Sequence, residues 1–183
     1  DTLDLVIYDI YALEKELMKS AYYAKKLPQY EEELEDGIRT MVSIFTAKKL
    51  LKELCDKYQV KAIMAHNARY DYFGLNTTMR YITKSQQRYF FPYGVEIWDT
   101  QKMAHDTICK QKKYIKFCEE NGYMTKHKNP RPQEKAEIIY RYISGNNEFV
   151  ERHTGLSDVM IEKEIFVRCL RQHKKMRKCL FEK

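Results

Sequence analysis

Glycine and proline are scarce in this chain, and their scarcity predicts a fold built from long regular elements. Six glycines and four prolines occur in 183 residues, against an average share of about 12% for the two together. Because these residues interrupt regular structure, their rarity favours helices. The length fits one domain, and we expect residues 1–183 to form a single domain.

Strand-like and helix-like segments alternate along the chain. Short apolar runs predict strands at 5–8, 60–65 and 95–98. Helix-like spacing of apolar residues, with Thr46 and Thr100 as N-caps and Pro28 as the first helix end, predicts the helices. Their expected ranges are 12–26, 46–58, 68 onward, 100–121, 132–143 and 157–178. This order predicts an α/β fold with a partly parallel sheet.

Charge and ring content point to a polyanion as partner. The formal net charge is +7, and such a balance favours nucleic acid over a neutral ligand. Fifteen tyrosines, eight phenylalanines and one tryptophan supply rings on which bases stack. A merely soluble basic protein is the simpler interpretation, and charge alone does not separate the two.

The apolar runs and the cysteines indicate where in the cell the protein is expected. No apolar run approaches the roughly 20 residues of a membrane span, so we expect no membrane association. The five cysteines lack the spacing of a disulfide framework or a zinc site. We therefore expect reduced, partly buried thiols in a cytoplasmic protein.

Polar side chains follow two of the predicted strands, where open α/β sheets carry their chemistry. His66 and Asn67 end the strand at 60–65, and Asp71 lies one turn into the next helix, where it can lean back over the strand end. Spacing alone does not separate a site role for Asp71 from a surface carboxylate. Asp99 ends the next strand, and for it we favour a plain helix N-cap.

A third polar segment precedes the last predicted helix. His153 lies in a loop, and Asp158 opens the helix, where the helix dipole stabilises a carboxylate. Taken alone, each has a simpler interpretation, as an exposed histidine and a cap. Taken together, they suit a fixed metal ligand beside a base whose pKa lies near neutrality.

These three segments carry a family resemblance. Asn67-x-x-Tyr70-Asp71 resembles the second motif of DEDD 3′→5′ exonucleases, and His153-x-x-x-x-Asp158 resembles the third motif of the DEDDh branch. The intervening Asp99-Thr100 is similar to that branch's strand ending before a helix. The branch includes the proofreading epsilon subunit of bacterial DNA polymerase III. The local sequence of this chain is most similar to that of small phage-encoded exonucleases. The resemblance covers residues 46–180.

The resemblance implies a fold, a reaction and a site. The fold is ribonuclease H-like, a mixed sheet flanked by helices, and the whole chain would be one exonuclease-like domain. Two divalent ions, Mg²⁺ or Mn²⁺, would be held by Asp71 and Asp158, with His153 as general base. Asn67, Tyr70 and His66 would line the substrate. The expected activity is hydrolysis at DNA 3′ ends, with single strands as substrate, in the cytoplasm, or in the host cytoplasm if phage-encoded.

The first family motif departs from the pattern. That motif is Asp-x-Glu on the first strand, and the family has three antiparallel strands before its first helix. No Asp-x-Glu occurs before Asp71, and only about ten residues precede helix-like sequence. We therefore expect the missing strands and motif in segments outside this chain. The alternatives are a catalytically inactive nucleic-acid-binding protein on the same fold, or an RNA exonuclease.

Two basic stretches have less specific interpretations. Residues 87–93 interleave Arg88 with aromatic rings and could contact a strand, although core packing of Phe90 and Phe91 is favoured. The C-terminal residues are expected to form a basic, solvated helix end that can also touch phosphates. Its cations are Arg171, His173, Lys174, Lys175, Arg177 and Lys178.

Overall fold

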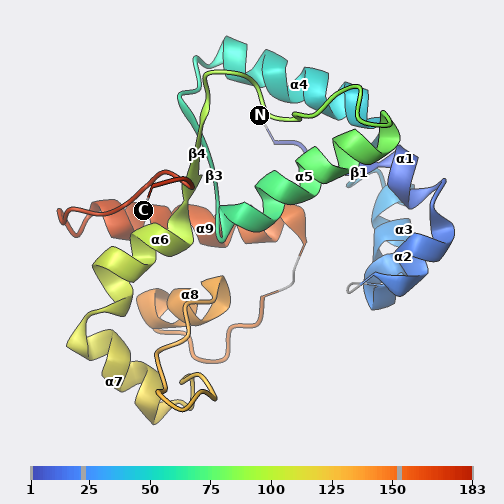
Figure 1. Ribbon diagram of the computed structural model, residues 1–183. Helices are drawn as coiled ribbons and strands as arrows, with labels where there is room; N and C mark the ends of the chain where they lie inside the picture. The colour runs from blue at the N-terminus through green and yellow to red at the C-terminus, as the bar shows by residue number, and fades with distance from the viewer. Residues whose placement is uncertain (1, 22–23, 152–153, 183) are drawn as a thin grey trace. The chain divides into compact units, whose positions relative to one another are not determined.

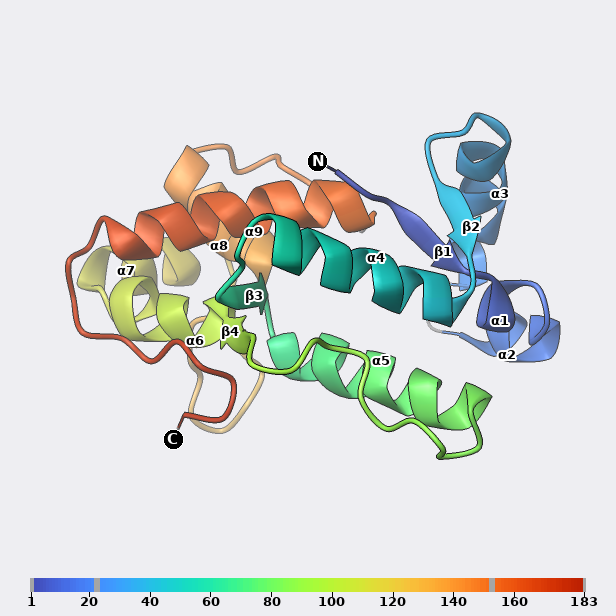
Figure 2. The same ribbon diagram turned by 90° about the horizontal axis from the view of Figure 1, so that it is seen from above.

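Helices and short parallel strand pairs make up the fold, which confirms the predicted α/β class (Figures 1 and 2). The computed structural model describes residues 2–21, 24–151 and 154–182. Chain contacts divide the protein into two units, described separately below. Unit 1 comprises residues 1–61 and 73–95, and unit 2 comprises residues 62–72 and 96–183. The expectation of a single domain stays a prediction.

Unit 1 is built around helix α4 and a short parallel strand pair. Strand β1 (Leu5–Ile7) pairs with β2 (Thr40–Val42), which had no counterpart in the expectations. Ile44, Ala47, Met79 and Phe90 form its buried core. The helices are α1 (Tyr8–Tyr11), α2 (Lys15–Ser20), η1 (Ala24–Lys26), α3 (Leu27–Glu35), α4 (Ile44–Lys57) and the second half of α5 (Ala68–Ile82).

The predicted first helix at 12–26 is wrong. Among the described residues of that range, only Lys15–Ser20 are α-helical, in α2, and Pro28 lies in the first turn of α3 instead of ending a helix. The first helical turn tolerates proline because its N–H has no partner within the helix in any case. The acidic stretch that follows Pro28 therefore belongs to α3.

Helix α4 begins earlier than expected because Ser43, not Thr46, is its N-cap. The Ser43 Oγ accepts a hydrogen bond from the Thr46 N–H at 3.1 Å. The Asp9 carboxylate accepts another from the Ile44 N–H at 2.7 Å. Two oxygens thus satisfy N–H groups that the first helical turn leaves unpaired.

Unit 2 contains the strands that precede the predicted site. Strand β3 (Ala62–Ala65) pairs in parallel with β4 (Glu96–Asp99), in register from Ala62 opposite Glu96 to Ala65 opposite Asp99. Fully buried Met103, Ile139 and Ile165 join α6, α8 and α9 in one core. The helical elements are α6 (Thr100–Ala104), the π-helical turn η2 (His105–Cys109), α7 (Lys112–Glu120), α8 (Ala136–Ser144) and α9 (Gly155–Leu170).

The single helix expected at 100–121 is wrong, because it is interrupted by η2 and a turn. The Thr107 hydroxyl donates to the Met103 carbonyl at 2.7 Å, and the Gln111 amide donates to the Thr107 carbonyl at 2.6 Å. Side chains that bond these carbonyls offer the backbone an alternative to the regular helix ladder. The expected helix at 132–143 begins instead at Ala136, and Gly145 ends it in the left-handed conformation with φ 71°.

The last helix ends at Leu170, so the predicted extension to residue 178 is wrong. The chain beyond it runs antiparallel to β4: the Asp99 N–H donates to the Lys178 carbonyl at 2.8 Å, and the Leu180 N–H donates to the Ile97 carbonyl at 2.7 Å. Figure 1 shows this tail beside β4. This pairing gives hydrogen-bond partners to backbone groups of the tail and of the β4 edge. The basic tail is therefore not a helix end.

All five cysteines are free thiols, four of them buried, as expected. No helix within the described ranges combines the length and the apolar character that crossing a membrane requires.

Candidate functional site

The parallel pairing of β3 and β4 brings two polar strand ends together in unit 2. Ala65 and Asp99 are register partners, so the residues that follow each strand emerge side by side. His66 and Asn67 follow β3, and Thr100 follows β4. This edge is the place where open α/β sheets position functional side chains.

Asp99 joins the two strand ends through a single oxygen. Its Oδ1 accepts hydrogen bonds from the Gln101 N–H at 2.9 Å and from the Asn67 N–H at 3.1 Å. The residue is only 4% exposed, so these bonds are made away from water. The favoured N-cap role of Asp99 is confirmed, and Thr100, the expected cap, is the first residue of α6.

His66 is held by hydrogen bonds on both ring nitrogens. Its Nε2 lies 2.7 Å from the Glu134 carbonyl oxygen, and its Nδ1 lies 3.1 Å from the Thr100 hydroxyl. Because a carbonyl only accepts, Nε2 carries the proton, and the Thr100 hydroxyl donates to Nδ1. Burial lowers the pKa of His66, which keeps the ring neutral. His66 thus connects the end of β3 to Thr100 and Glu134, and its substrate-lining role stays a prediction.

Asn67 and Tyr70 lie where the chain turns from β3 into α5. Asn67 is exposed and has φ 61°, a left-handed conformation that asparagine tolerates better than most residues. The Tyr70 side chain is 72% exposed, so its ring is available to a ligand. Their predicted contact with substrate stays a prediction.

Carboxylates from two helices converge near this strand end. Asp71 lies in the first turn of α5, and Asp158 lies in the first turn of α9. Burial, followed by the charges of Asp99 and Asp158, raises the pKa of Asp71. Asp71 is solvent-exposed, so screening by water reduces the increase in pKa that burial causes. The charges of Asp71 and Asp158 therefore interact, although the two residues are far apart in sequence, and their metal-binding role stays a prediction.

Glu162 is a member of this group that the sequence analysis missed. Burial raises its pKa to about 7, with further contributions from Asp71, Asp158 and Glu151, while the His66 N–H donates to it and opposes the shift. Glu162 lies four residues after Asp158 in α9, and this spacing places both on one helix face. The four-residue spacing from Asp158 is the sequence signal from which Glu162 could have been identified.

The other predicted site residue of this segment is His153, which lies outside the described residues. Thr154 is the N-cap residue of α9, and its carbonyl accepts from the Asp158 N–H at 3.0 Å. The Ser157 hydroxyl donates to the Asp158 carboxylate at 3.4 Å.

The predicted metal site concerns the carboxylates described above, and it stays a prediction. Within the described part of the chain, no group of three or more His, Cys, Asp or Glu side chains is arranged to hold a metal ion. The donor chemistry does fit, because Asp71, Asp158 and Glu162 supply the hard oxygens that Mg²⁺ and Mn²⁺ prefer. Their mutual repulsion is also the kind that a bound cation relieves.

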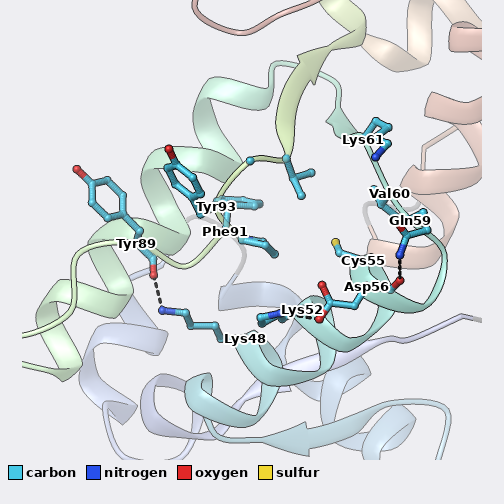
Figure 3. A pocket seen from close by; sticks show the side chains of 13 residues that line it. Lys48, Lys52, Cys55, Asp56, Gln59, Val60, Lys61, Tyr89, Phe91 and Tyr93 are labelled. Carbon is cyan, nitrogen blue, oxygen red and sulfur yellow. Dashed lines mark hydrogen bonds and ion pairs between the residues drawn. The ribbon is translucent and has the colours of Figure 1, made fainter.

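The basic, aromatic stretch at 87–93 contains both buried and exposed rings, so core packing and contact with a nucleic-acid strand fall to different residues. Phe90 is buried in the core of unit 1, as favoured, while Tyr89 and Tyr93 are exposed. Figure 3 shows the exposed rings beside a pocket of about 500 Å³, where the Lys48 Nζ donates to the Tyr89 carbonyl at 2.8 Å. The Lys52 ammonium across the pocket is paired with Asp56.

Neither a protein-family model nor a curated protein nor a solved structure matches this chain.

Proposed function

We propose that this protein is a metal-dependent 3′→5′ exonuclease that hydrolyses phosphodiester bonds at DNA 3′ ends, with single strands as its substrate. The observation that carries the proposal is that Asp71, one turn after β3, and Asp158, in the first turn of α9, lie near enough for their charges to interact. Each comes from a segment that resembles a DEDDh motif. A ribonuclease H-like fold and membership of that branch are parts of the same proposal.

Asp71 and Asp158 would hold the divalent ions, and Glu162 would add a third carboxylate from α9. The bound ions would supply an activated water and stabilise the leaving 3′ oxygen. His153 would take the proton from that water, a task suited to a side chain that titrates near neutrality. Asn67 and Tyr70 would contact the terminal nucleotide.

Asp99 and His66 would act on the site through other residues. Asp99 binds the Asn67 N–H, and the His66 N–H binds the Glu162 carboxylate. Both residues are themselves fixed by hydrogen bonds, so they hold the carboxylates and Asn67 in one arrangement. Such support matters because ligands that are free to rotate lose affinity for their ion.

A nucleic-acid-binding protein without hydrolytic activity is the second candidate. The carboxylates nearest the expected first motif have structural partners in unit 1: Asp9 accepts from the Ile44 N–H, and Asp4 lies 3.7 Å from the Arg39 guanidinium. Neither is followed by a glutamate two residues later. An RNA exonuclease would share all of the proposed chemistry and differ only in the sugar that it accepts.

The experiment is a time course on a 5′-labelled single-stranded DNA. We expect a ladder that shortens from the 3′ end, requires Mg²⁺ or Mn²⁺ and stops with a chelator. Asp71→Asn and Asp158→Asn should slow the appearance of the ladder, while Glu164→Gln, at an exposed carboxylate elsewhere on α9, should leave it intact. An RNA strand of the same sequence tests whether the protein prefers deoxyribose or ribose in its substrate. Binding without any ladder, at any metal concentration, would favour the second candidate.

A further inference from the structure

A basic hairpin in unit 2 joins α7 to α8 (Figure 1). Its two sides pair through the Thr125 N–H, which donates to the Arg131 carbonyl at 2.8 Å, and through a bridge between Met124 and Pro132. The fully buried Tyr114 donates its hydroxyl to the Gln133 carbonyl at 2.6 Å. The hairpin is therefore a built element, attached to the core of the unit.

The hairpin concentrates positive charge at the surface. Lys126, Lys128, Arg131 and Lys135 are all exposed, and none of their side chains has an ion-pair partner within the described ranges. Within residues 124–135 the sequence has one acid, Glu134, which is half-buried and has its Oε1 2.5 Å from the His105 Nδ1. The cations therefore repel one another without local neutralisation, and a bound anion would relieve that repulsion.

The shape of this surface favours an extended anion over a small one. The four cations line an open hollow of about 980 Å³ together with Gln101 and His105. They are spread over ten residues of sequence instead of converging on one point. The exposed tip, residues 126–131, carries no large apolar side chain that could anchor in a lipid surface. A chain of phosphates fits this arrangement best.

The base of the hairpin is linked to the carboxylates of the candidate site. The Glu134 carbonyl accepts from the His66 Nε2, and the His66 N–H donates to Glu162. One histidine thus connects the hairpin to the strand end where Asp71 and Asp158 converge. The hairpin and the candidate site are both parts of unit 2.

We propose that the hairpin at residues 124–135 binds the phosphate backbone of a single-stranded nucleic acid. This inference rests on the proposed function in one respect: the bound strand would be the one whose 3′ end reaches the carboxylates. The hairpin supplies affinity and no hydrolysis. Its contacts are electrostatic, so binding does not depend on base sequence.

The test measures binding of a short fluorescent oligothymidylate by anisotropy, in a chelator, between about 50 and 200 mM salt. Lys126→Gln, Lys128→Gln and Arg131→Gln are combined in one variant. The matched control combines Lys112→Gln, Lys113→Gln and Lys116→Gln in α7, which removes the same charge from exposed positions of the same unit. Circular dichroism checks that both variants fold.

The hairpin variant should bind at least about tenfold more weakly, and its salt slope should fall by about two, since each phosphate contact on a single strand contributes about 0.7. The control should lose less than about twofold, because its three lysines do not line the hollow at the hairpin. Equal losses in both variants, or unchanged binding by the hairpin variant, would overturn the proposal. Poly-glutamate bound as tightly as DNA and with the same dependence on the hairpin would assign it to an acidic protein partner.

A second readout separates this proposal from the proposed function. The p-nitrophenyl ester of thymidine 5′-monophosphate has a single phosphate, which the carboxylate site would take, so it offers the hairpin no further backbone phosphate. If the protein is an exonuclease, the hairpin variant should hydrolyse this ester at the wild-type rate while its KM for long single strands rises. If neither substrate is hydrolysed by wild-type protein, the proposed function fails, and the binding experiment still decides the role of the hairpin.

Discussion

Glu162 enters the carboxylate group one helical turn after Asp158, and its environment gives it an unusual titration. Its pKa is raised to about 7, above the value near 4.3 of an ordinary glutamate. Between these values the folded protein holds a proton that the unfolded chain has released. The free energy of unfolding therefore falls as pH rises through this window, because ionisation is less favourable in the folded state.

Glu162→Gln should remove this pH dependence. The variant cannot ionise, so in a chelator at about pH 8 we expect its free energy of unfolding to exceed that of wild type by about 1–2 kcal/mol, allowing for partial screening by solvent. At about pH 5 the difference should be small. Urea denaturation at both pH values measures it, with Glu164→Gln as the matched control on the same helix. A constant difference across this range would contradict the assigned titration.

His153 and Asp158 should differ in their response to metal. We expect His153→Ala to slow hydrolysis by roughly 10²–10⁴-fold, the usual contribution of a general base, with DNA affinity unchanged. Asp158→Asn should also slow hydrolysis, but through weaker ion binding, so excess Mn²⁺ should partly restore the rate. A titration of Mn²⁺ against initial rate measures both variants. Near wild-type turnover by folded His153→Ala would make the catalytic assignment wrong.

At the scale of elements, the C-terminal tail is held by one strong contact with η2. Arg177 lies 2.8 Å from the Asp106 carboxylate, and its guanidinium holds the pKa of that carboxyl well below the usual range. The Lys102 ammonium adds hydrogen bonds to the carbonyls of Leu180 and Glu182. The tail therefore lies against β4 through charge as well as through backbone pairing.

Arg177→Gln should loosen the tail and destabilise the protein by about 1 kcal/mol at neutral pH, since the pair is partly screened by solvent. The contribution is present above the pKa of an unfolded aspartate, near 3.9, and is lost as pH falls below it. The gap between wild type and variant should thus close in acid. Hydrogen exchange at Leu180 reports the tail directly, and Arg168→Gln, an exposed arginine in α9, is the control. Unchanged exchange at Leu180 would contradict this role for Arg177.

The sequence predicted elements whose signals are local and missed those decided by distant contacts. Strands β3 and β4 and the start of α5 follow from short apolar runs and from the turn at Asn67. Strand β2 has only three residues and forms because β1 lies beside it, so local pattern could not reveal it. The end of α9 was missed because pairing of the tail with β4 competes with helix extension.

In the candidate site, too, local signals could be read from the sequence and distant contacts could not. Asp71 and Asp158 were found from their motifs, and the N-cap role of Asp99 was found from its place after a strand. The fixed ring of His66 depends on the Glu134 carbonyl, which is 68 residues away, and no spacing rule reaches that far. Glu162 was recoverable from helix periodicity but only once Asp158 was placed in a helix.

At the scale of the whole molecule, the two units are interleaved in sequence. The chain crosses between them near residues 61, 72 and 95, and α5 contributes residues to both. Strand β4 of unit 2 is contiguous with the long C-terminal part, but its partner β3 is not. Unit 2 therefore cannot be obtained by cutting the chain once before β4.

This division predicts how fragments behave. A fragment of residues 96–183 should fail to fold, because β4 loses β3 and the hydrogen bond from the Asn67 N–H to Asp99. A fragment of residues 62–183 keeps both strands and should fold with a cooperative thermal transition. Circular dichroism and calorimetry of the two fragments measure this. Cooperative unfolding of the shorter one would show that β3 is dispensable.

The two hydrogen bonds that meet on the Asp99 carboxylate also have a consequence for folding kinetics. The bond to the Gln101 N–H spans two residues and forms as soon as α6 begins, whereas the bond to the Asn67 N–H closes a loop of 32 residues. Closing a long loop has an entropic cost that nearby contacts repay only once the strands are paired. The same oxygen therefore takes part in an early local step and in a late non-local one. Its second bond marks the moment at which β3 and β4 come into register.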